Sequence, residues 1–573
     1  MWDWASTMPS LMRGDVSPRA TRMTTLVEPL HDAITGDVRR PLEVLQAAVV
    51  LILLIAVANI ALLLSSRATR RSRELALRNA LGATGRRITQ QLLTESVVLA
   101  TLGGCVGVFL AVGLVDLITH SRAVSLPRLD DVAVNWRVLA FTLAVSVAAG
   151  LAFGAAPATA LGRGRITEKL ADAERGGVGS SARRFNGTLI VAQLALAVML
   201  LISAGLVLQS FRKLTGTPLG FQPEGVMTIA LPLPAAKYTN DTLVAAATSE
   251  IVDRVRAVPA VRFAAASWTL PVGGNYNSDG YLVEGHAPPA ATGMETQTVQ
   301  LGVGPGFFHT LGMPLRYGRD FDDRDRAGSL PVTIVDEALA SRYWRGADAL
   351  GHRVRLTGDT TWRMIVGVAG SVRDADPAEP PVPHSYFPFA QAPDPRPMLA
   401  LRTDAAPGPV LAAVKQAIAG VEPGVPLDNV RSLADWTGQS LDTRRITEIL
   451  LGGFALLAAL LASVGIYGVM TLYVADRYRE FGVRLAIGAD PRGLVRMVLG
   501  QGIVLAAAGV GIGIVGALAA TRWLRTLLYG VSPTDPIVYA TLAGALLALA
   551  TASVYLPARR AARSDPLIAL RAE

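Results

Sequence analysis

The chain has 573 residues, of which 51% are hydrophobic and only 17% are charged, and its mean hydropathy is +0.39. Ordinary soluble domains carry about 25% charged residues, so a wholly soluble protein is excluded. The formal net charge of +9 is not accompanied by any nucleic-acid-binding motif, which leaves membrane lipids as the expected counterpart of the basic residues.

Seven apolar runs are long enough to cross a bilayer, which takes roughly 20 helical residues. They lie at 43–65, 92–118, 137–160, 187–209, 447–474, 497–521 and 537–557. The runs predict an α-helical polytopic membrane protein with seven spans. Their centres carry almost no ionisable residues, which argues against a proton- or sodium-driven carrier and against a polar channel.

Lysine and arginine are concentrated in alternate loops between these spans. The loops after the first, third and fifth spans are basic, as is the C-terminal tail, whereas the other short loops hold few basic residues. Basic loops face the cytoplasm, so we expect the N-terminus outside and the C-terminus inside. The large loop 212–443 is then outside. Residues 1–41 have no signal peptide. Either this short tail is translocated together with the first helical hairpin, or a span that precedes it is missing from this chain. We favour the second interpretation, in which residues 1–41 are the end of a first outer domain.

An eleven-residue basic motif occurs twice, each time just after an apolar run. The copies Arg73–Ala83 and Arg479–Ala489 lie 406 positions apart. In each copy a glutamate and an arginine four residues apart can pair along one helix face, beside an apolar stripe, and a glycine ends the helix. Such a pair is worth only about 0.2–0.5 kcal/mol, so stability alone does not explain two copies.

We therefore interpret this motif as a helix on which a cytoplasmic partner docks; the alternative is a juxtamembrane helix bound to lipid headgroups. The candidate docking residues are Arg73, Glu74, Arg78, Gly82, Arg479, Glu480, Arg484 and Gly488.

The repeat extends into the next span of each half. Gly103 and Gly107 recur 406 positions later as Gly509 and Gly513, and both pairs form GxxxG, which allows close helix packing in membranes. Spans one to three thus match spans five to seven, whereas the fourth has no counterpart in the first half. The expected units are 42–160, a cytoplasmic linker 161–186, a transmembrane helix 187–211, the outer domain 212–443 and a second three-span unit 444–573.

The outer domain is predicted to be α+β. Strands are expected at 226–233, 261–268, 332–335, 353–356, 364–369, 398–402 and 425–430, and helices at 242–257, 337–344 and 408–419. The first and last of these elements form βαβ-like halves around a central stretch of short strands, 280–390.

No motif for catalysis or for a cofactor is present. There is no G-x-x-x-x-G-K-[ST] sequence for holding nucleotide phosphates and no metal-ligand spacing. We interpret His286, His309, His352 and His384 as surface or turn histidines, and the acidic run Asp320–Asp325 as a solvated turn. We therefore predict no catalytic, metal or cofactor site.

Several motifs together resemble a known family. The R-E-x-x-x-R helices, L-L-Y-G-V-S-P-T-D-P at 527–536 and the ending P-A-R-R-A-A-R-S-D-P-L-I-A-L-R resemble FtsX-like/MacB-like ABC transporter permeases. The segments 304–325 and 335–344 resemble the MacB-type periplasmic core domain. Two fused copies resemble the duplicated permeases first named from acidobacteria.

The resemblance implies a multi-pass protein of the bacterial inner membrane that contains no ATPase of its own. The two motif helices would contact a separate cytoplasmic ABC ATPase, whose closure would be transmitted to the periplasmic domain, and a periplasmic adaptor or substrate protein would be a further partner. Two alternatives stay open: a signalling or scaffold protein that regulates a partner such as a cell-wall hydrolase, and a membrane-anchored enzyme.

Overall fold

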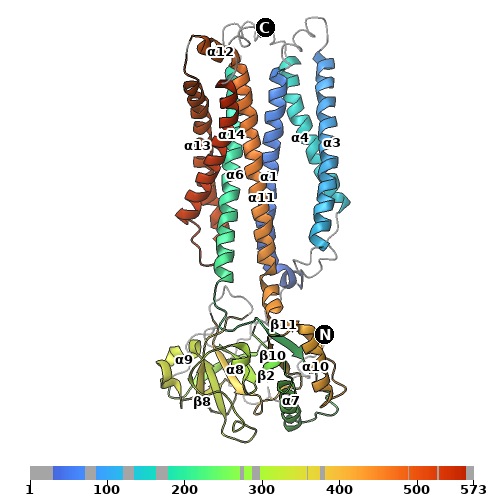
Figure 1. Ribbon diagram of the computed structural model, residues 1–573, viewed down its shortest axis with the longest axis vertical. Helices are drawn as coiled ribbons and strands as arrows, with labels where there is room; N and C mark the ends of the chain where they lie inside the picture. The colour runs from blue at the N-terminus through green and yellow to red at the C-terminus, as the bar shows by residue number, and fades with distance from the viewer. Residues whose placement is uncertain are drawn as a thin grey trace, which may run out of the picture.

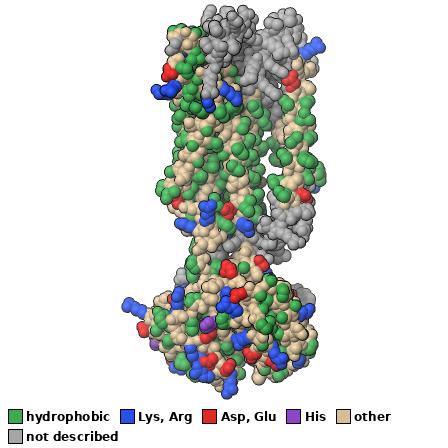
Figure 2. Space-filling view, viewed as in Figure 1, with side chains coloured by type: hydrophobic (Ala, Val, Ile, Leu, Met, Phe, Trp, Pro, Cys, Tyr) green, Lys and Arg blue, Asp and Glu red, His purple; other side chains and the backbone are tan. Residues whose placement is uncertain are grey.

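The structure consists of a bundle of long helices with an α/β domain at one end (Figure 1). The computed structural model describes residues 30–70, 85–120, 135–162, 179–271, 277–286, 297–357, 359–374, 381–487, 489–525 and 528–562. In the space-filling view, hydrophobic side chains cover the middle of the bundle, while charged ones gather on the α/β domain and at the bundle's ends (Figure 2). This banding is what a membrane-spanning protein requires.

The bundle contains six of the seven predicted spans. Its helices are α1 (Leu30–Arg70), α3 (Gly85–His120), α4 (Trp136–Gly162), α6 (Gly179–Thr215), α11 (Leu433–Asp476), α13 (Pro491–Leu524) and α14 (Pro536–Ala562), with the short α12 (Tyr478–Ala486) between α11 and α13. Within the described residues, six of these helices are long and apolar enough to cross a membrane. The third predicted span lies in α4, whose described apolar part is only Trp136–Ala148, so the seventh span stays a prediction.

Helix α6 is the centre of the bundle. It packs against α13, α11, α1 and α14, and α1 also packs against α11. Buried side chains from six helices form one apolar cluster, which includes Ile55, Leu194, Ala458, Val510 and Val554. Helices α3 and α4 pack on each other and join the rest of the bundle through α4 and α1.

The described part of the α/β domain holds eleven strands. They are β1 (Val226–Ala230), β2 (Val261–Ser267), β3 (Asn277–Val283), β4 (Gln297–Val303), β5 (Leu315–Gly318), β6 (Val332–Asp336), β7 (Arg353–Leu356), β8 (Arg363–Ala369), β9 (His384–Pro388), β10 (Met398–Thr403) and β11 (Asp428–Ser432). The helices are α7 (Asp241–Arg256), α8 (Phe307–Leu311), α9 (Glu337–Tyr343), the 3-10 turn η5 (Gly346–Ala349) and α10 (Pro407–Ala419).

The strands form two units. In the first, the order β11-β1-β10-β2 is antiparallel, so β1-α7-β2 and β10-α10-β11 are two interlocked split βαβ motifs, as the sequence predicted. In the second, the order β4-β3-β7-β8-β6-β9 closes on itself through the parallel pair β9 and β4. Among the described strands, the two units are joined along the sheet where β2 meets β4, at the pair Ser267 and Val303.

Most predicted strands are confirmed to within a few residues, and one is misplaced. The last strand is β11, Asp428–Ser432, rather than 425–430. Val425 and Leu427 pack on the helix-covered core before the strand begins, so their apolar character belongs to a turn. The predicted domain boundaries at 211/212 and 443/444 both fall inside continuous helices, α6 and α11.

Candidate functional site

Helix α12 lies at the end of the bundle opposite the α/β domain (Figure 1). It follows α11 after the single residue Arg477, whose backbone angles (φ −106°, ψ 11°) break the long helix. Asp490 then caps α13 by accepting a hydrogen bond from the Arg492 amide at 3.0 Å, and Pro491 occupies the first turn. The second copy of the repeated motif is therefore a separate short helix held between two transmembrane helices.

The apolar face of α12 is anchored in the bundle. Phe481 is 1% exposed and belongs to the bundle's core cluster, and Leu485 packs against the same cluster. The guanidinium of Arg477 lies 4.8 Å from the ring centroid of Tyr473 on α11. Because these contacts hold one side of α12, a force on its other side would act on the bundle.

The opposite face of α12 is accessible. Arg484 Nη2 lies 2.7 Å from Glu480 Oε1, so the predicted pair four residues apart is confirmed, and Arg477 Nε lies 3.7 Å from Glu480 Oε2. Both side chains of the main pair remain about two-fifths exposed, at 40% and 43%. Val483 and Ile487 are exposed beside them, Ile487 at 80%. The surface thus combines a weak, solvent-screened ion pair with bare apolar side chains.

For the other candidate docking residues, the structure gives little information about their contacts. Arg73, Glu74, Arg78 and Gly82 of the first motif copy lie outside the described residues, as does Gly488. Arg479 lies within α12. The docking role of both helices therefore stays a prediction.

The two GxxxG pairs have different surroundings. A Cβ added to Gly509 would lie 2.6 Å from the Leu194 Cβ, and one added to Gly513 would lie 2.6 Å from the Val198 Cβ, so α13 touches α6 at both glycines. A Cβ on Gly103 or Gly107 meets no described atom within 4 Å. Among the described residues, close helix contact thus occurs at the second pair but not at the first.

A polar junction joins three helices, and it was not predicted from the sequence. Asn59 of α1 and Gln193 of α6 both donate side-chain amide hydrogen bonds to the backbone carbonyl of Leu461 on α11, at 2.9 and 2.7 Å. Their exposed fractions are 7% and 1%. Gly465 makes room for them, because its Cβ would lie 2.6 Å from Gln193 Oε1 and 2.7 Å from Asn59 Oδ1. Two amide side chains inside otherwise apolar runs were the available sequence signal.

Replacing Gly465 by alanine should lower the stability of the bundle, because the new methyl group overlaps two buried amide oxygens. We expect a loss of about 2 kcal/mol relative to Gly468→Ala, since overpacking costs roughly 1–3 kcal/mol. Gly468 is a matched control on the same helix with no described atom within 4 Å of its added Cβ. Thermal unfolding of the intact chain in detergent micelles measures the difference; equal melting temperatures would contradict a structural role for this junction.

In the α/β domain, His384 forms a buried ionic cluster, so its interpretation as a surface or turn residue is wrong. Its side chain is 1% exposed and stands between two carboxylates. His384 Nε2 lies 3.2 Å from Asp374 Oδ1, and Nδ1 lies 2.8 Å from the Val382 carbonyl and 4.0 Å from Asp336 Oδ2. A neutral imidazole has one N–H and cannot donate to both the carbonyl and Asp374, whereas the imidazolium can.

The pKa values of this cluster agree with that geometry. Burial lowers the pKa of His384, but the hydrogen bond to Asp374 and the attraction of both carboxylates outweigh it, so the pKa of His384 is raised above its usual value. Desolvation raises the pKa of Asp336, and the charge of His384 opposes this only in part. Asp336 also caps α9 by accepting a hydrogen bond from the Leu339 amide at 2.9 Å. The cluster therefore ties β6, α9 and β9 together.

The acidic run at 320–325 is only partly solvated. Asp325 is buried, and its carboxylate accepts two hydrogen bonds from Arg319, at 2.7 and 2.9 Å. Asp322 at the surface pairs with Arg324 at 2.7 Å. Within the described ranges, no group of three or more His, Cys, Asp or Glu side chains could hold a metal ion.

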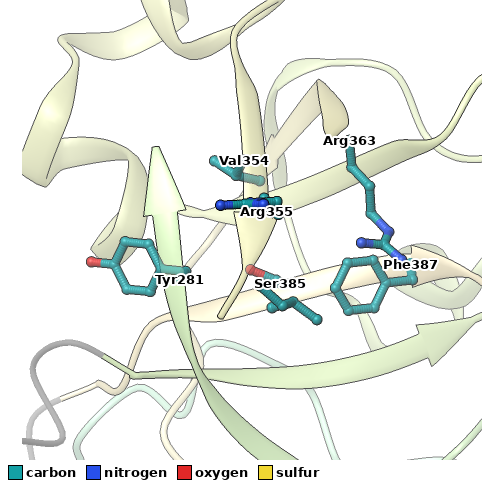
Figure 3. Close-up of a pocket in the computed structure, with 7 residues that line it drawn as sticks. Tyr281, Val354, Arg355, Arg363, Ser385 and Phe387 are labelled. Carbon is teal, nitrogen blue, oxygen red and sulfur yellow. The ribbon is translucent and has the colours of Figure 1, made fainter. Parts of the chain in front are cut away.

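A small hollow lies between β3, β7, β8 and β9 (Figure 3). Its volume is about 10 Å³, room for one water molecule at most. The Arg363 guanidinium lies 4.9 Å from the centroid of the Phe387 ring on one side of it. This hollow is too small to hold an organic substrate.

Comparison with protein families matches most of the chain. The model of the FtsX-like permease C-terminal family matches residues 47–164 and again 452–566. The model of the MacB-like periplasmic core domain matches residues 188–421, which include most of α6 and most of the α/β domain. The same family model thus matches the helices of both halves.

Curated relatives are similar over parts of their length. The macrolide export ATP-binding/permease protein MacB of Rhodospirillum rubrum is 27% identical over 49% of this chain and 44% of its own. MacB of Wolinella succinogenes is 34% identical over 25% of this chain and 22% of its own. The uncharacterized ABC transporter permease YknZ of Bacillus subtilis is 25% identical over 49% of this chain and 71% of its own. The chain therefore spans less than half the length of these two MacB relatives.

Solved structures of outer domains are also similar. The periplasmic region of MacB from Actinobacillus actinomycetemcomitans has a TM-score of 0.26 and 13% identity, and the match covers 39% of this chain and 95% of that structure. The extracellular domain of the noncanonic ABC-type transporter YknZ has a TM-score of 0.23 and 16% identity, covering 35% and 100%.

Proposed function

We propose that this chain, which belongs to the FtsX-like permeases with a MacB-like periplasmic core domain, transmits movement from a cytoplasmic ATPase to its α/β domain. It would be the permease subunit of an ABC-type export system in the bacterial inner membrane. We propose that a separate ATPase subunit supplies the energy; residues 1–573 contain no phosphate-binding loop. The α/β domain would lie in the periplasm and the C-terminus in the cytoplasm.

One observation carries this proposal: α11 is a single helix of 44 residues, Leu433–Asp476, that connects the α/β domain to α12. At 1.5 Å per residue it is about 66 Å long, more than the thickness of a bilayer. A continuous hydrogen-bonded helix is stiff along its axis, so displacement of α12 would also displace the end of α11 that lies in the α/β domain. This transmission requires no pore through the membrane.

The far end of α11 is fixed in the α/β domain. Ser432 caps the helix by accepting a hydrogen bond from the Asp435 amide at 2.9 Å. Leu433 is fully buried in the domain core, and the Arg431 guanidinium lies 4.1 Å from the centroid of the Trp436 ring. The first turn of α11 therefore belongs to the outer domain, and its movement would displace the strands β1 and β11 beside it.

Reversing the charge of the exposed face of α12 should uncouple the ATPase. For Glu480→Lys combined with Glu74→Lys, we expect at least about ten-fold weaker stimulation of the ATPase, equivalent to about 1.4 kcal/mol of docking free energy. The ATPase to use is the ABC ATPase that copurifies with the unmodified chain. Its activity is measured with the permease in nanodiscs, and membrane insertion should be unchanged.

The confirmed pair between Glu480 and Arg484 supplies a control. The double variant Glu480→Arg with Arg484→Glu keeps a pair four residues apart and so preserves α12, but it inverts the charges offered to a partner. If α12 is the docking element, this swapped variant should also stimulate the ATPase only weakly. If the swap restores stimulation, or if the original double variant keeps it, α12 is not the docking element.

A further inference from the structure

The amide junction of Asn59 and Gln193 with the Leu461 carbonyl divides α11 into two unequal arms. Helix α11 runs from the α/β domain to the opposite end of the bundle (Figure 1). At 1.5 Å per residue, Leu461 lies about 22 Å from Asp476, the last residue before the break that leads into α12. It lies about 42 Å from Leu433, which is buried in the core of the α/β domain. The arm that ends in the α/β domain is therefore about twice as long as the arm that ends at α12.

The hydrogen bonds of this junction lie inside the membrane-spanning part of α11. Leu461 belongs to the apolar span Arg444–Ala475. Its carbonyl accepts hydrogen bonds from both amides, and Gln193 Nε2 also lies 3.3 Å from Asn59 Oδ1. The hydrocarbon region offers no water to replace such bonds, so pulling the helices apart here would leave buried amide groups unpaired. The junction therefore fixes α11 to α1 and α6 at the level of Leu461.

Helix α6 is itself tied to other helices of the bundle, so it can serve as the support of α11. The loop between α13 and α14 binds the end of α6 that leads into the α/β domain. Ser210 Oγ accepts a hydrogen bond from the Tyr529 amide at 2.7 Å, and Gln209 Nε2 donates one to Asp535 Oδ2 at 3.0 Å. Both loop residues belong to the L-L-Y-G-V-S-P-T-D-P segment at 527–536. Because α13 also touches α6 at two glycines, a load on the junction is taken up by α13 and α14 as well.

The longer arm of α11 packs on its neighbours through small side chains. Between residues 452 and 460, the buried residues of α11 are Ala455, Ala458 and Ala459. Alanine side chains form low ridges on a helix surface, so a tilt of this arm does not require interdigitated side chains to separate. A fixed point at Leu461 with a smooth surface beyond it is what a lever needs.

A stiff helix that is fixed at one point and displaced sideways at one end turns about that point. We infer that the junction of Asn59, Gln193 and Leu461 is the fulcrum of α11. A sideways displacement of α12 then moves the first turn of α11 in the opposite direction and about twice as far. This inference rests on the proposed function and adds to it the direction and the ratio of the movement.

The test imposes the displacement chemically on the full chain in lipid nanodiscs, without an ATPase. Cys105→Ser removes the single cysteine, and Phe185→Cys on α6 and Ala475→Cys on α11 add two at exposed positions near the α12 end of the bundle. A short or a long bis-maleimide then holds these two residues at different separations. Spin-labelled non-natural amino acids at the exposed positions Arg212 on α6 and Asp435 on α11 report the distance at the other end by double electron–electron resonance.

The short linker should lengthen the label distance relative to the long linker, by about twice the difference that the linkers impose. Asn59→Leu combined with Gln193→Leu should abolish this opposite response, because two apolar side chains cannot hold the Leu461 carbonyl. Ser463→Ala is the matched control, since the Ser463 hydroxyl donates to the Ala459 carbonyl within α11 at 2.7 Å and joins no second helix there. It should leave the response unchanged.

An unchanged label distance, or a change of the same sign at both ends, would show that α11 does not turn about Leu461. Either result overturns the inference, even if the double leucine variant does not fold. A response that survives in the double leucine variant would equally overturn it, because the fulcrum would then lie elsewhere. Since no ATPase takes part, these failures are distinguishable from a failure of the docking role of α12, which the stimulation assay tests.

Discussion

Replacing His384 by alanine is expected to destabilise the α/β domain by about 3–5 kcal/mol, the cost of removing one partner from a buried ion pair. The variant leaves the carboxylates of Asp336 and Asp374 facing each other across an empty site, with no cation between them. Each must then stay charged in an apolar surrounding or take up a proton, and both outcomes cost free energy of folding. The contacts that tie β9 to β6 and α9 are lost at the same time.

Because of this cluster, the free energy of unfolding of the unmodified chain should depend on pH. The pKa of His384 is raised in the folded state, so its contribution to stability is complete below about pH 6.5 and is lost as the pH rises through the raised value. The pKa of Asp336 is also raised, so it acts in the same direction from about pH 3.8 upward. The free energy of unfolding of the domain should therefore fall above neutral pH, by up to about 1.4 kcal/mol per pH unit for one proton.

Both the loss of stability in His384→Ala and its pH dependence can be measured by unfolding the intact chain with urea in detergent micelles. Susceptibility of the α/β domain to proteolysis reports the fraction unfolded. His384→Ala should remove the dependence above pH 6.5 that the histidine causes. His309→Ala is the matched control, because the His309 side chain is 68% exposed and its loss should change stability by no more than about 0.5 kcal/mol. If both variants unfold at the same urea concentration, the buried cluster does not stabilise the domain.

Gly513→Leu is expected to cost about 3 kcal/mol, the upper part of the range for overpacking. The new side chain would start 2.6 Å from the Val198 Cβ and 2.8 Å from the Ala195 carbonyl oxygen. A backbone carbonyl cannot rotate away as a side chain can, so α13 must move away from α6. Because most of the bundle packs on α6, the loss of stability should extend beyond the contact at Gly513.

Gly511→Leu separates this packing effect from helix propensity. Gly511 lies on the same helix, two residues away, and its added Cβ meets no described atom within 4 Å. Both variants gain the same helix propensity, so the difference between their melting temperatures in detergent reports the contact with α6 alone. Gly511→Leu should be neutral or stabilising, and a cost equal to that of Gly513→Leu would contradict the close contact.

Features that depend on neighbouring residues could be predicted from the sequence. A helix in lipid must satisfy its own backbone hydrogen bonds, so hydropathy alone located the long helices. The pair of Glu480 and Arg484 is set by one turn of helix and was predictable for the same reason. The split βαβ halves of the outer domain also follow from local alternation and helical spacing.

Features that join distant residues could be recognised only in the folded chain. The Asn59, Gln193 and Leu461 junction brings together three helices, and His384 becomes buried because strands β6 and β9 pair beside it. Even within one helix, the sequence predicts only part of the structure. For Phe481, periodicity predicted an apolar stripe on α12, but not that the stripe faces the bundle. Likewise, the glycines of the repeat touch α6 where they lie on α13, whereas those on α3 meet no described atom within 4 Å. A residue's spacing sets which helix face it lies on, whereas the packing of the whole chain decides what that face touches.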